Sequence, residues 1–98
     1  MPFRLLFTKQ ANTDMDELES RPFMERQRKA VRKALGYLET NLRHPSLKTH
    51  KYKAVKGIGG ADVFEAYAEN NTNAAYRIFW QYGPEKLALT ILGIVAHP

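Results

Sequence analysis

The residues that could carry chemistry are concentrated in the middle of the chain, and most of them are basic. Between Arg21 and Lys56 there are eleven lysine and arginine residues and only two acids, Glu25 and Glu39, which gives this stretch a formal charge of +9. The remainder carries four basic and eight acidic residues, a charge of −4. A basic patch of this kind is the usual electrostatic footprint of proteins that bind phosphate backbones. A solvated helix face explains the same charges without a ligand, so the charge pattern leaves both interpretations open.

The other residue types exclude several kinds of catalytic and structural site. The chain has no cysteine, which excludes a thiol nucleophile, a zinc ribbon and a disulfide-stapled fold. His44 and His50 lie six residues apart beside proline and lysine, with few carboxylates near them, so no metal site is expected. Arg77 stands out because it interrupts an apolar strand pattern. We therefore expect any chemistry to be carried out by oxygen, nitrogen and guanidinium groups of the side chains, without a metal or another cofactor.

These residues need a scaffold, and hydropathy and turn signals predict one with the element order β-α-α-β-β-β. The stretch Pro45–Gly60 has no sustained apolar period and is expected to be an exposed basic loop. Short connections between the last three strands indicate an antiparallel meander. The expected bounds are a strand over Phe3–Thr8, a short helix from an N-cap at Thr13 to about Glu19, a long helix from about Pro22 to Asn41, and strands over Asp62–Glu69, Ala74–Tyr82 and Lys86–Ala96.

Length and composition agree with this scaffold. Ninety-eight residues, 44% of them hydrophobic, suit one packed domain over residues 1–98. We expect a two-layer α+β fold, in which the three C-terminal strands and the N-terminal strand form a sheet with both helices packed on one face. No stretch is long and apolar enough for a membrane span, and the first residues lack the apolar length of a secretory signal. A cytoplasmic protein without membrane contact is therefore expected.

A family resemblance rests on three segments. These segments are the strand Tyr76-Arg77-Ile78-Phe79-Trp80-Gln81-Tyr82, the terminal Ala96-His97-Pro98, and Leu47-Lys48-Thr49-His50-Lys51 ahead of Asp62-Val63-Phe64-Glu65. They resemble the corresponding segments of the RelE/ParE superfamily of toxins from bacterial toxin–antitoxin pairs. The element order over the whole chain is also similar, and within the superfamily the chain looks RelE-like. The resemblance implies an RNA endonuclease, usually one that cleaves messenger RNA in the ribosomal A site and so inhibits translation. It also implies a small antitoxin partner, often an acidic or amphipathic segment that wraps the toxin.

The resemblance further implies a metal-free reaction, in which a ribose 2′-hydroxyl attacks the adjacent phosphorus while side chains transfer protons. Arg77 matches the strand arginine that contacts the scissile phosphate in the family, and His97 stands where several members place a proton-transferring histidine. The best-studied RNA-cleaving relatives carry two lysines in the preceding strand, where this chain has Glu65 and Tyr67. By alternation these two share a strand face, so Glu65 is a candidate base and Tyr67 a candidate stacking platform or proton donor.

Each of these residues also has a purely structural interpretation. Arg77 and Glu65 would form an ion pair, Tyr67 would be ordinary packing, and His97 would be a frayed end. Contacts to the backbone of messenger or ribosomal RNA are expected from a set of basic residues in the middle of the chain, namely Lys48, Lys51, Lys53, Lys56, Arg28 and Arg32. The alternative function, favoured by Glu65 in place of lysine, is a non-catalytic binding module: a ParE-like gyrase poison, or an inactive relative that only binds an antitoxin.

Overall fold

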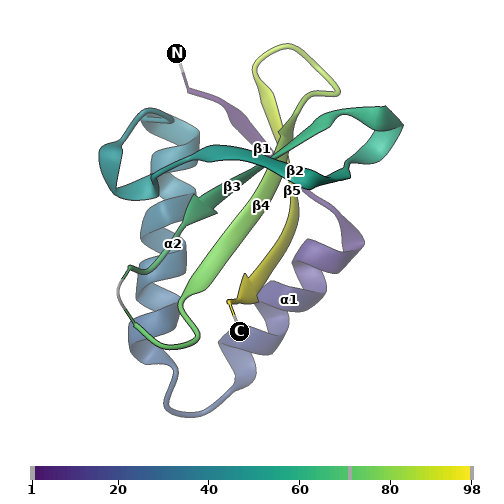
Figure 1. Ribbon diagram of the computed structural model, residues 1–98. Helices are drawn as coiled ribbons and strands as arrows, with labels where there is room; N and C mark the ends of the chain where they lie inside the picture. Colours follow the sequence, from purple (N-terminus) through teal and green to yellow (C-terminus); the bar gives the residue numbers. More distant parts are fainter. Residues whose placement is uncertain (1, 71, 98) are drawn as a thin grey trace.

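The computed structural model describes residues 2–70 and 72–97, and Met1, Asn71 and Pro98 lie outside the described residues. Its strands form one sheet, and its two helices pack together on one side of that sheet (Figure 1). The elements are β1 (Arg4–Phe7), α1 (Lys9–Ser20), α2 (Glu25–Thr40), the 3-10 turn η1 (Pro45–Leu47), β2 (His50–Lys56), the 3-10 turn η2 (Ile58–Gly60), β3 (Asp62–Tyr67), β4 (Tyr76–Tyr82) and β5 (Ala88–Ala96).

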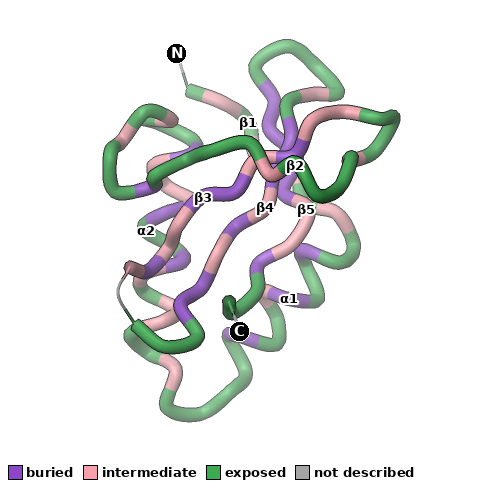
Figure 2. Tube along the Cα trace, in the orientation of Figure 1, coloured by how far each residue is buried: buried purple, intermediate pink, exposed green. Residues whose placement is uncertain are grey.

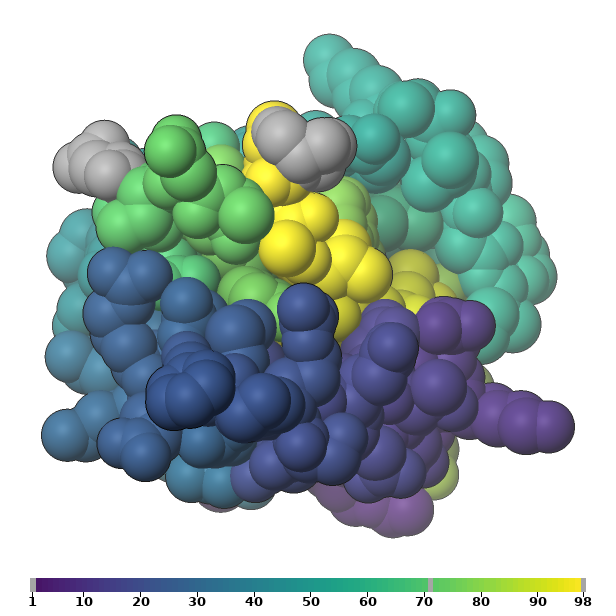
Figure 3. All heavy atoms as spheres, turned by 90° about the horizontal axis from the view of Figure 1, so that it is seen from below, coloured from purple at the N-terminus to yellow at the C-terminus, as the bar shows by residue number. Residues whose placement is uncertain are grey.

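The sheet has five strands in the order β1-β5-β4-β3-β2. β1 pairs with β5 in parallel, and the other neighbours are antiparallel. The expected two-layer α+β architecture is therefore confirmed, including the C-terminal meander and the placement of both helices on one face. Figure 3, seen from below, shows α1 and α2 side by side as one layer beneath the strands.

The core lies between this helical layer and the sheet. Trp80 and Ile78 of β4 and Val31 and Leu38 of α2 are all 0% exposed. Their spacing, two residues apart in the strand and seven apart in the helix, places each pair on one face of its element. By alternation Tyr82 belongs to the same face as Trp80, but it is the last residue of β4 and is 52% exposed. Burial falls away from the interior toward the loops and β2 (Figure 2).

The exposed basic loop expected over Pro45–Gly60 is wrong in part, because its centre forms β2. His50 pairs with Glu65 and Lys51 with Phe64, and the register then shifts before Lys56 pairs with Asp62. β2 is an edge strand exposed along most of its length, so it shows no alternation of apolar and polar residues (Figure 2). Its lysines are the kind of charge that protects an open sheet edge from pairing with another chain.

The helix bounds also differ from those expected. α1 begins four residues before the expected cap at Thr13, because the hydroxyl of Thr8 accepts a hydrogen bond of 3.0 Å from the backbone N–H of Ala11. α2 begins at Glu25 instead of Pro22. Inside α1, the buried carboxylate of Asp14 accepts a hydrogen bond of 2.9 Å from the backbone N–H of Ile94 in β5. This contact fixes the helical layer to the strand that ends near the candidate site.

Candidate functional site

Four polar or aromatic side chains meet on the face of the sheet that the helices leave uncovered. The strand register sets His50 of β2 opposite Glu65 of β3, and Tyr67 of β3 opposite Arg77 of β4. Glu65 and Tyr67 are two residues apart and so point to the same face. β2 crosses in front of β3 and β4 on this side of the molecule (Figure 1). We call His50, Glu65, Tyr67 and Arg77 the Arg77 cluster.

Arg77 is the most constrained member of the cluster. Its side chain is only 12% exposed, and its guanidinium carbon lies 3.8 Å from the centre of the Tyr67 ring. Nη1 donates hydrogen bonds to the backbone carbonyls of Ala75 at 3.2 Å and Glu69 at 3.4 Å. Among the described residues the buried Nε–H has no hydrogen-bond acceptor. The guanidinium is thus held rigidly while keeping donor capacity for a further acceptor.

Glu65 lies between two basic side chains, Arg77 and His50. Its Oε2 is 3.7 Å from Nε of Arg77, and its Oε1 is 2.8 Å from Nε2 of His50. The ion pair that the sequence suggested as a structural role for Glu65 and Arg77 is therefore present in the structure. The carboxylate is 9% exposed, whereas His50 is 47% exposed and covers it from the solvent side.

The hydrogen bonds of His50 define where protons reside. Its Nδ1 lies 3.0 Å from the carbonyl oxygen of Lys48, which can only accept, so Nδ1 carries a hydrogen. The short contact between Nε2 and Glu65 then requires one more proton, held either by the imidazole or by the carboxyl group. His50 and Glu65 together form a pair with one transferable proton on an open face of the sheet.

His50 is the site residue that the sequence-based reasoning missed, since it was considered only as a metal ligand. Its role depends on the pairing of β2 with β3, and β2 has no apolar alternation that would predict a strand. The second candidate metal ligand, His44, accepts a hydrogen bond of 3.1 Å from the backbone N–H of Ser46 and stacks on Tyr37 at 3.7 Å. Over residues 2–70 and 72–97 there is no group of three or more histidine, aspartate and glutamate side chains that could hold a metal ion.

His97 follows directly after β5 and lies close to Arg77. Its backbone N–H donates to the carbonyl of Ala75 at 2.8 Å, and the yellow C-terminal residues lie beside the green segment that precedes β4 (Figure 3). Arg77 and His97 both line an open hollow of about 310 Å³, together with residues 72–75. All four sequence-predicted catalytic candidates therefore lie on β3, on β4 or just after β5. Glu65 and Tyr67 lie on the β3 side of Arg77, and His97 lies on its β5 side.

The four lysines predicted to bind RNA differ in their surroundings. Lys56 and Lys51 both pair with Asp62, at 2.7 and 3.2 Å. The hydrogen bond from Lys56, followed by that from Lys51, holds the pKa of the Asp62 carboxyl below its ordinary value. Nζ of Lys48 lies 6.0 Å from the centre of the Tyr67 ring, at the border of the Arg77 cluster. Lys53 is exposed and has no ion pair within the described part of the chain.

The two arginines predicted to bind RNA lie in the helical layer, away from the Arg77 cluster. Arg28 donates to the backbone carbonyl of Arg21 at 2.8 Å and to that of Leu18 at 3.3 Å. Arg32 forms a two-pronged ion pair with Glu19, in which the Nε–Oε1 distance is 3.1 Å. Both side chains therefore join α2 to α1, and an RNA contact by either of them stays a prediction.

Comparison with known proteins gives a clear result at the level of fold. No protein-family model and no curated protein matches the chain. Several solved structures are similar over nearly the whole chain, among them the following three. The archaeal RelE–RelB complex from Pyrococcus horikoshii OT3 is 18% identical with a TM-score of 0.64, covering 98% of this chain and 96% of that one. The YoeB/ParE toxin from Agrobacterium tumefaciens is 10% identical with a TM-score of 0.68, covering 97% and 99%.

The third structure is the RelBE2 toxin–antitoxin complex from Mycobacterium tuberculosis, which is 23% identical with a TM-score of 0.58 and covers 99% of this chain and 100% of that one. Such low identities establish the fold and not the activity. The chain therefore has the fold of the RelE, YoeB and ParE toxins, as the sequence resemblance implied. No helix in the described ranges is long and apolar enough to cross a membrane.

Proposed function

We propose that this protein is the toxin of a toxin–antitoxin pair and that it acts as a metal-free RNA endonuclease on messenger RNA at the ribosome, thereby inhibiting translation. The observation that carries the proposal is the Arg77 cluster, in which a rigidly held guanidinium adjoins a carboxylate–imidazole pair on the uncovered face of the sheet. The likeness in fold to RelE, YoeB and ParE toxins supports the same conclusion. We expect such a protein to work in the cytoplasm, as a single domain and without a small-molecule cofactor.

The proposed reaction is an in-line transfer at phosphorus. The 2′-oxygen of a ribose forms a bond to the adjacent phosphorus, the bond from phosphorus to the 5′-oxygen breaks, and the products are a 2′,3′-cyclic phosphate and a 5′-hydroxyl. One group must take the proton of the 2′-hydroxyl, and another must protonate the departing 5′-oxygen. Donors near phosphorus must stabilise the negative charge that grows on its other oxygens.

Arg77 supplies that stabilisation in the proposal. Its guanidinium is oriented in advance by Ala75, Glu69 and the Tyr67 ring, so little conformational freedom is lost when a phosphate binds. Tyr67, besides fixing Arg77, is the proposed platform for a base next to the scissile phosphate.

Proton transfer is assigned to groups on both sides of Arg77. On the side of β2, the pair of Glu65 and His50 holds one transferable proton, and the more exposed His50 is the member that RNA can reach. On the other side, His97 shares the hollow with Arg77. A base and an acid that lie on opposite sides of a phosphate-binding group fit an in-line reaction, because the attacking and departing oxygens lie opposite one another.

An antitoxin is the proposed protein partner. The complexes from Pyrococcus horikoshii and Mycobacterium tuberculosis contain an antitoxin, by their own descriptions. In this chain, Val55 is 51% exposed and Ile58 is 62% exposed, and both line an apolar groove beside Lys56. An amphipathic segment with acidic residues would cover the apolar groove and neutralise the neighbouring lysines.

The test is cleavage of an end-labelled messenger RNA by the purified protein, with and without ribosomes and in the presence of EDTA. We expect cleavage that resists EDTA and leaves 2′,3′-cyclic phosphate ends. Replacing a charge-stabilising donor typically costs a factor of roughly 10²–10³, so Arg77→Gln and His97→Ala should each slow cleavage strongly. The exposed Lys29, which has no partner among the described residues, provides the matched control Lys29→Gln. If the Arg77→Gln/His97→Ala double variant cleaved as fast as the parent, the assignment would be wrong.

The second candidate function is a non-catalytic binding module. It is favoured by the contact between Glu65 and Arg77, because an arginine already paired with a carboxylate needs no RNA to balance its charge. Inhibition of DNA gyrase supercoiling without RNA cleavage would select a gyrase poison. A protein that binds its antitoxin but neither arrests growth nor cleaves RNA would select an inactive relative.

A further inference from the structure

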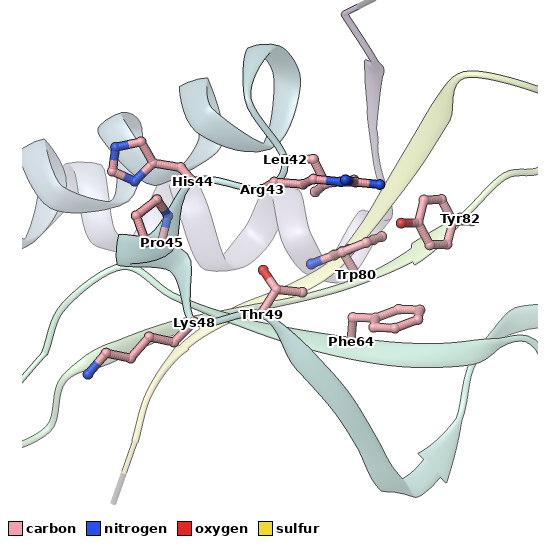
Figure 4. A pocket seen from close by; sticks show the side chains of 9 residues that line it. All are labelled: Leu42, Arg43, His44, Pro45, Lys48, Thr49, Phe64, Trp80 and Tyr82. Atoms are coloured by element: carbon pink, nitrogen blue, oxygen red, sulfur yellow. The ribbon is translucent and has the colours of Figure 1, made fainter.

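A second site lies at the edge of the sheet on the face that the helices cover, outside the Arg77 cluster. It is a pocket of about 320 Å³ at the place where the segment between α2 and β2, which includes the turn η1, meets the sheet (Figure 4). Phe64, Trp80 and Tyr82 form its aromatic wall, and Arg43, Lys48 and Thr49 contribute polar groups. A volume of this size is at the small end of ligand sites in proteins and suits a ligand no larger than one nucleotide.

An unpaired donor marks the pocket as a site for a hydrogen-bond acceptor. Trp80 is 0% exposed, and its indole Nε1–H has no hydrogen-bond partner in the described structure. Figure 4 shows the indole nitrogen directed toward Thr49. A buried N–H without an acceptor is costly, and in a native structure it calls for an explanation such as an absent ligand. Thr49 is an exposed residue, and its hydroxyl pairs with none of the described residues.

The wall beside the indole is aromatic. Phe64 stacks on Trp80 at 4.8 Å with an angle of 21° between the rings, and Tyr82 meets both rings edge-on at 5.5 and 4.9 Å. Tyr82 is 52% exposed at the rim, so the aromatic surface extends from the interior to solvent. Planar bases of single-stranded RNA bind to aromatic surfaces of this type by stacking.

Two cations lie at opposite ends of the pocket. Figure 4 shows the guanidinium of Arg43 above Trp80 and near Tyr82, whereas Lys48 extends away from the aromatic wall. Arg43 forms no ion pair with any residue that the structure describes. Nζ of Lys48 lies 6.0 Å from the Tyr67 ring, so Lys48 borders both the pocket and the Arg77 cluster. A nucleotide within an RNA chain has a phosphate on each side, and cations at the two ends match that arrangement.

Lys48 and Thr49 form the side of the pocket toward which the indole nitrogen points (Figure 4). Lys48, which ends the turn η1 (Pro45–Leu47), has a left-handed backbone conformation with φ 44 and ψ 40. This conformation is unfavourable for a residue with a side chain, so a shift of Lys48 and Thr49 outward would relieve strain. The indole N–H, which water does not reach in this conformation, would then become accessible to an inserted acceptor atom.

We propose that this pocket holds one unpaired nucleotide of the RNA substrate, with its base against the aromatic wall, acceptor atoms of the base facing Trp80 and Thr49, and the flanking phosphates near Arg43 and Lys48. The assignment rests on the proposed RNA cleavage, because the nucleotide in the pocket is taken to belong to the same RNA substrate, with Lys48 bordering both sites. An acidic peptide is the less suitable occupant, since a carboxylate needs one cation and gains nothing from stacking.

Trp80 is the only tryptophan in the chain, so its fluorescence reports on the pocket directly. The first experiment adds the four common ribonucleoside 5′-monophosphates separately, with inorganic phosphate as the comparison. We expect a saturable change of the Trp80 emission with at least one nucleotide and none with phosphate at the same concentration. No response to any nucleotide, an equal response to inorganic phosphate, or a response only to a short glutamate-rich peptide would each overturn the proposal.

The second experiment uses Arg43→Gln and Thr49→Val, two exposed positions whose replacement leaves the core intact. Each variant should bind the responsive nucleotide roughly three- to tenfold more weakly, the effect of one lost hydrogen bond, while Lys29→Gln should bind like the parent. In RNA cleavage the double variant should have a raised KM and an unchanged kcat. Unchanged affinity and unchanged KM would overturn the proposal even if the protein cleaves RNA. Nucleotide binding that depends on Arg43 and Thr49 in a protein that cleaves no RNA would support the pocket and refute the nuclease.

Discussion

Replacement of Glu65 by glutamine tests the construction of the Arg77 cluster most directly. Glutamine has nearly the same shape, and its amide N–H₂ can donate to Nε2 of a neutral His50, so the contact that is 2.8 Å in the parent can persist. The negative charge opposite Arg77 is lost, however, and Arg77 is only 12% exposed. The variant therefore removes one partner of a buried ion pair and changes little else.

The size of the effect follows from what Arg77 retains. Removing one partner of a buried ion pair typically costs about 3–5 kcal/mol, because the other charge is left buried and uncompensated. Arg77 keeps two hydrogen bonds to backbone carbonyls and its contact with the Tyr67 ring, and the parent ion pair is long at 3.7 Å. We therefore expect a loss of about 2 kcal/mol in the free energy of unfolding. For a protein of this size that loss corresponds to a decrease in Tm of roughly 8–16 °C.

Urea denaturation followed by Trp80 fluorescence measures this loss, since Trp80 is the only tryptophan and is 0% exposed in the folded state. Glu39→Gln, at an exposed position of α2, is the matched control and should change stability by less than about 0.5 kcal/mol. A Glu65→Gln/Arg77→Met double variant should be more stable than the sum of the two single changes predicts. A loss below about 0.5 kcal/mol in Glu65→Gln, or strict additivity in the double variant, would refute the ion pair. If Glu65 also transfers protons, the same substitution slows RNA cleavage by a factor of roughly 10²–10⁴.

Two further substitutions concern contacts around the site. Asp14→Ala should destabilise the protein by roughly 1–3 kcal/mol, because the backbone N–H of Ile94 loses its buried acceptor; a thermal melt that matches the parent would refute the role of this contact. Because the pKa of Asp62 is lowered in the folded state by Lys56 and Lys51, its contribution to stability is full above the ordinary carboxyl range and is lost as the pH falls through the lowered value. The Asp62→Asn variant should lack this component of acid sensitivity. The same variant releases both lysines from their ion pairs, so it should bind single-stranded RNA with a steeper salt dependence. The slope of log K against log salt should become steeper by up to about 1.4. An unchanged slope would show that these lysines do not contact RNA.

Most of the fold could be predicted because its internal elements have strong periodic patterns. The stripe of α2 and the alternation of β4 identify Val31, Leu38, Ile78 and Trp80 as core positions, and all four are 0% exposed. β2 could not be predicted in this way. It is stabilised by pairing with β3 at the sheet edge and buries almost nothing, so its sequence shows no pattern that reflects its neighbours.

The candidate site was predictable only where it depends on those patterned strands. Glu65 and Tyr67 lie on β3, and alternation was enough to place them on one face. Arg77 of β4 joins them through the register that sets it opposite Tyr67. His50 could not be identified, because its contact with Glu65 depends on the register between β2 and β3. The unpaired Trp80 N–H was equally invisible, since a tryptophan on the core face of a strand normally indicates packing alone.

The positive charge in the middle of the chain has a different meaning once its partners are known. Arg28 and Arg32 bind groups of α1, and Lys51 and Lys56 bind Asp62, so a large part of the local charge of +9 stabilises the protein itself.

Arg43, Lys48 and Lys53 form no ion pair within residues 2–70 and 72–97. They lie between α2 and η1, just after η1, and on β2, respectively. The first two line the pocket that contains the unpaired indole N–H. Electrostatic attraction of a polyanion depends on cations that have no internal partner, because a paired cation offers little net charge to a ligand. The surface that attracts RNA is therefore expected at the open sheet edge formed by η1 and β2, between the pocket and the Arg77 cluster, and not on the helical layer where the basic residues are most numerous.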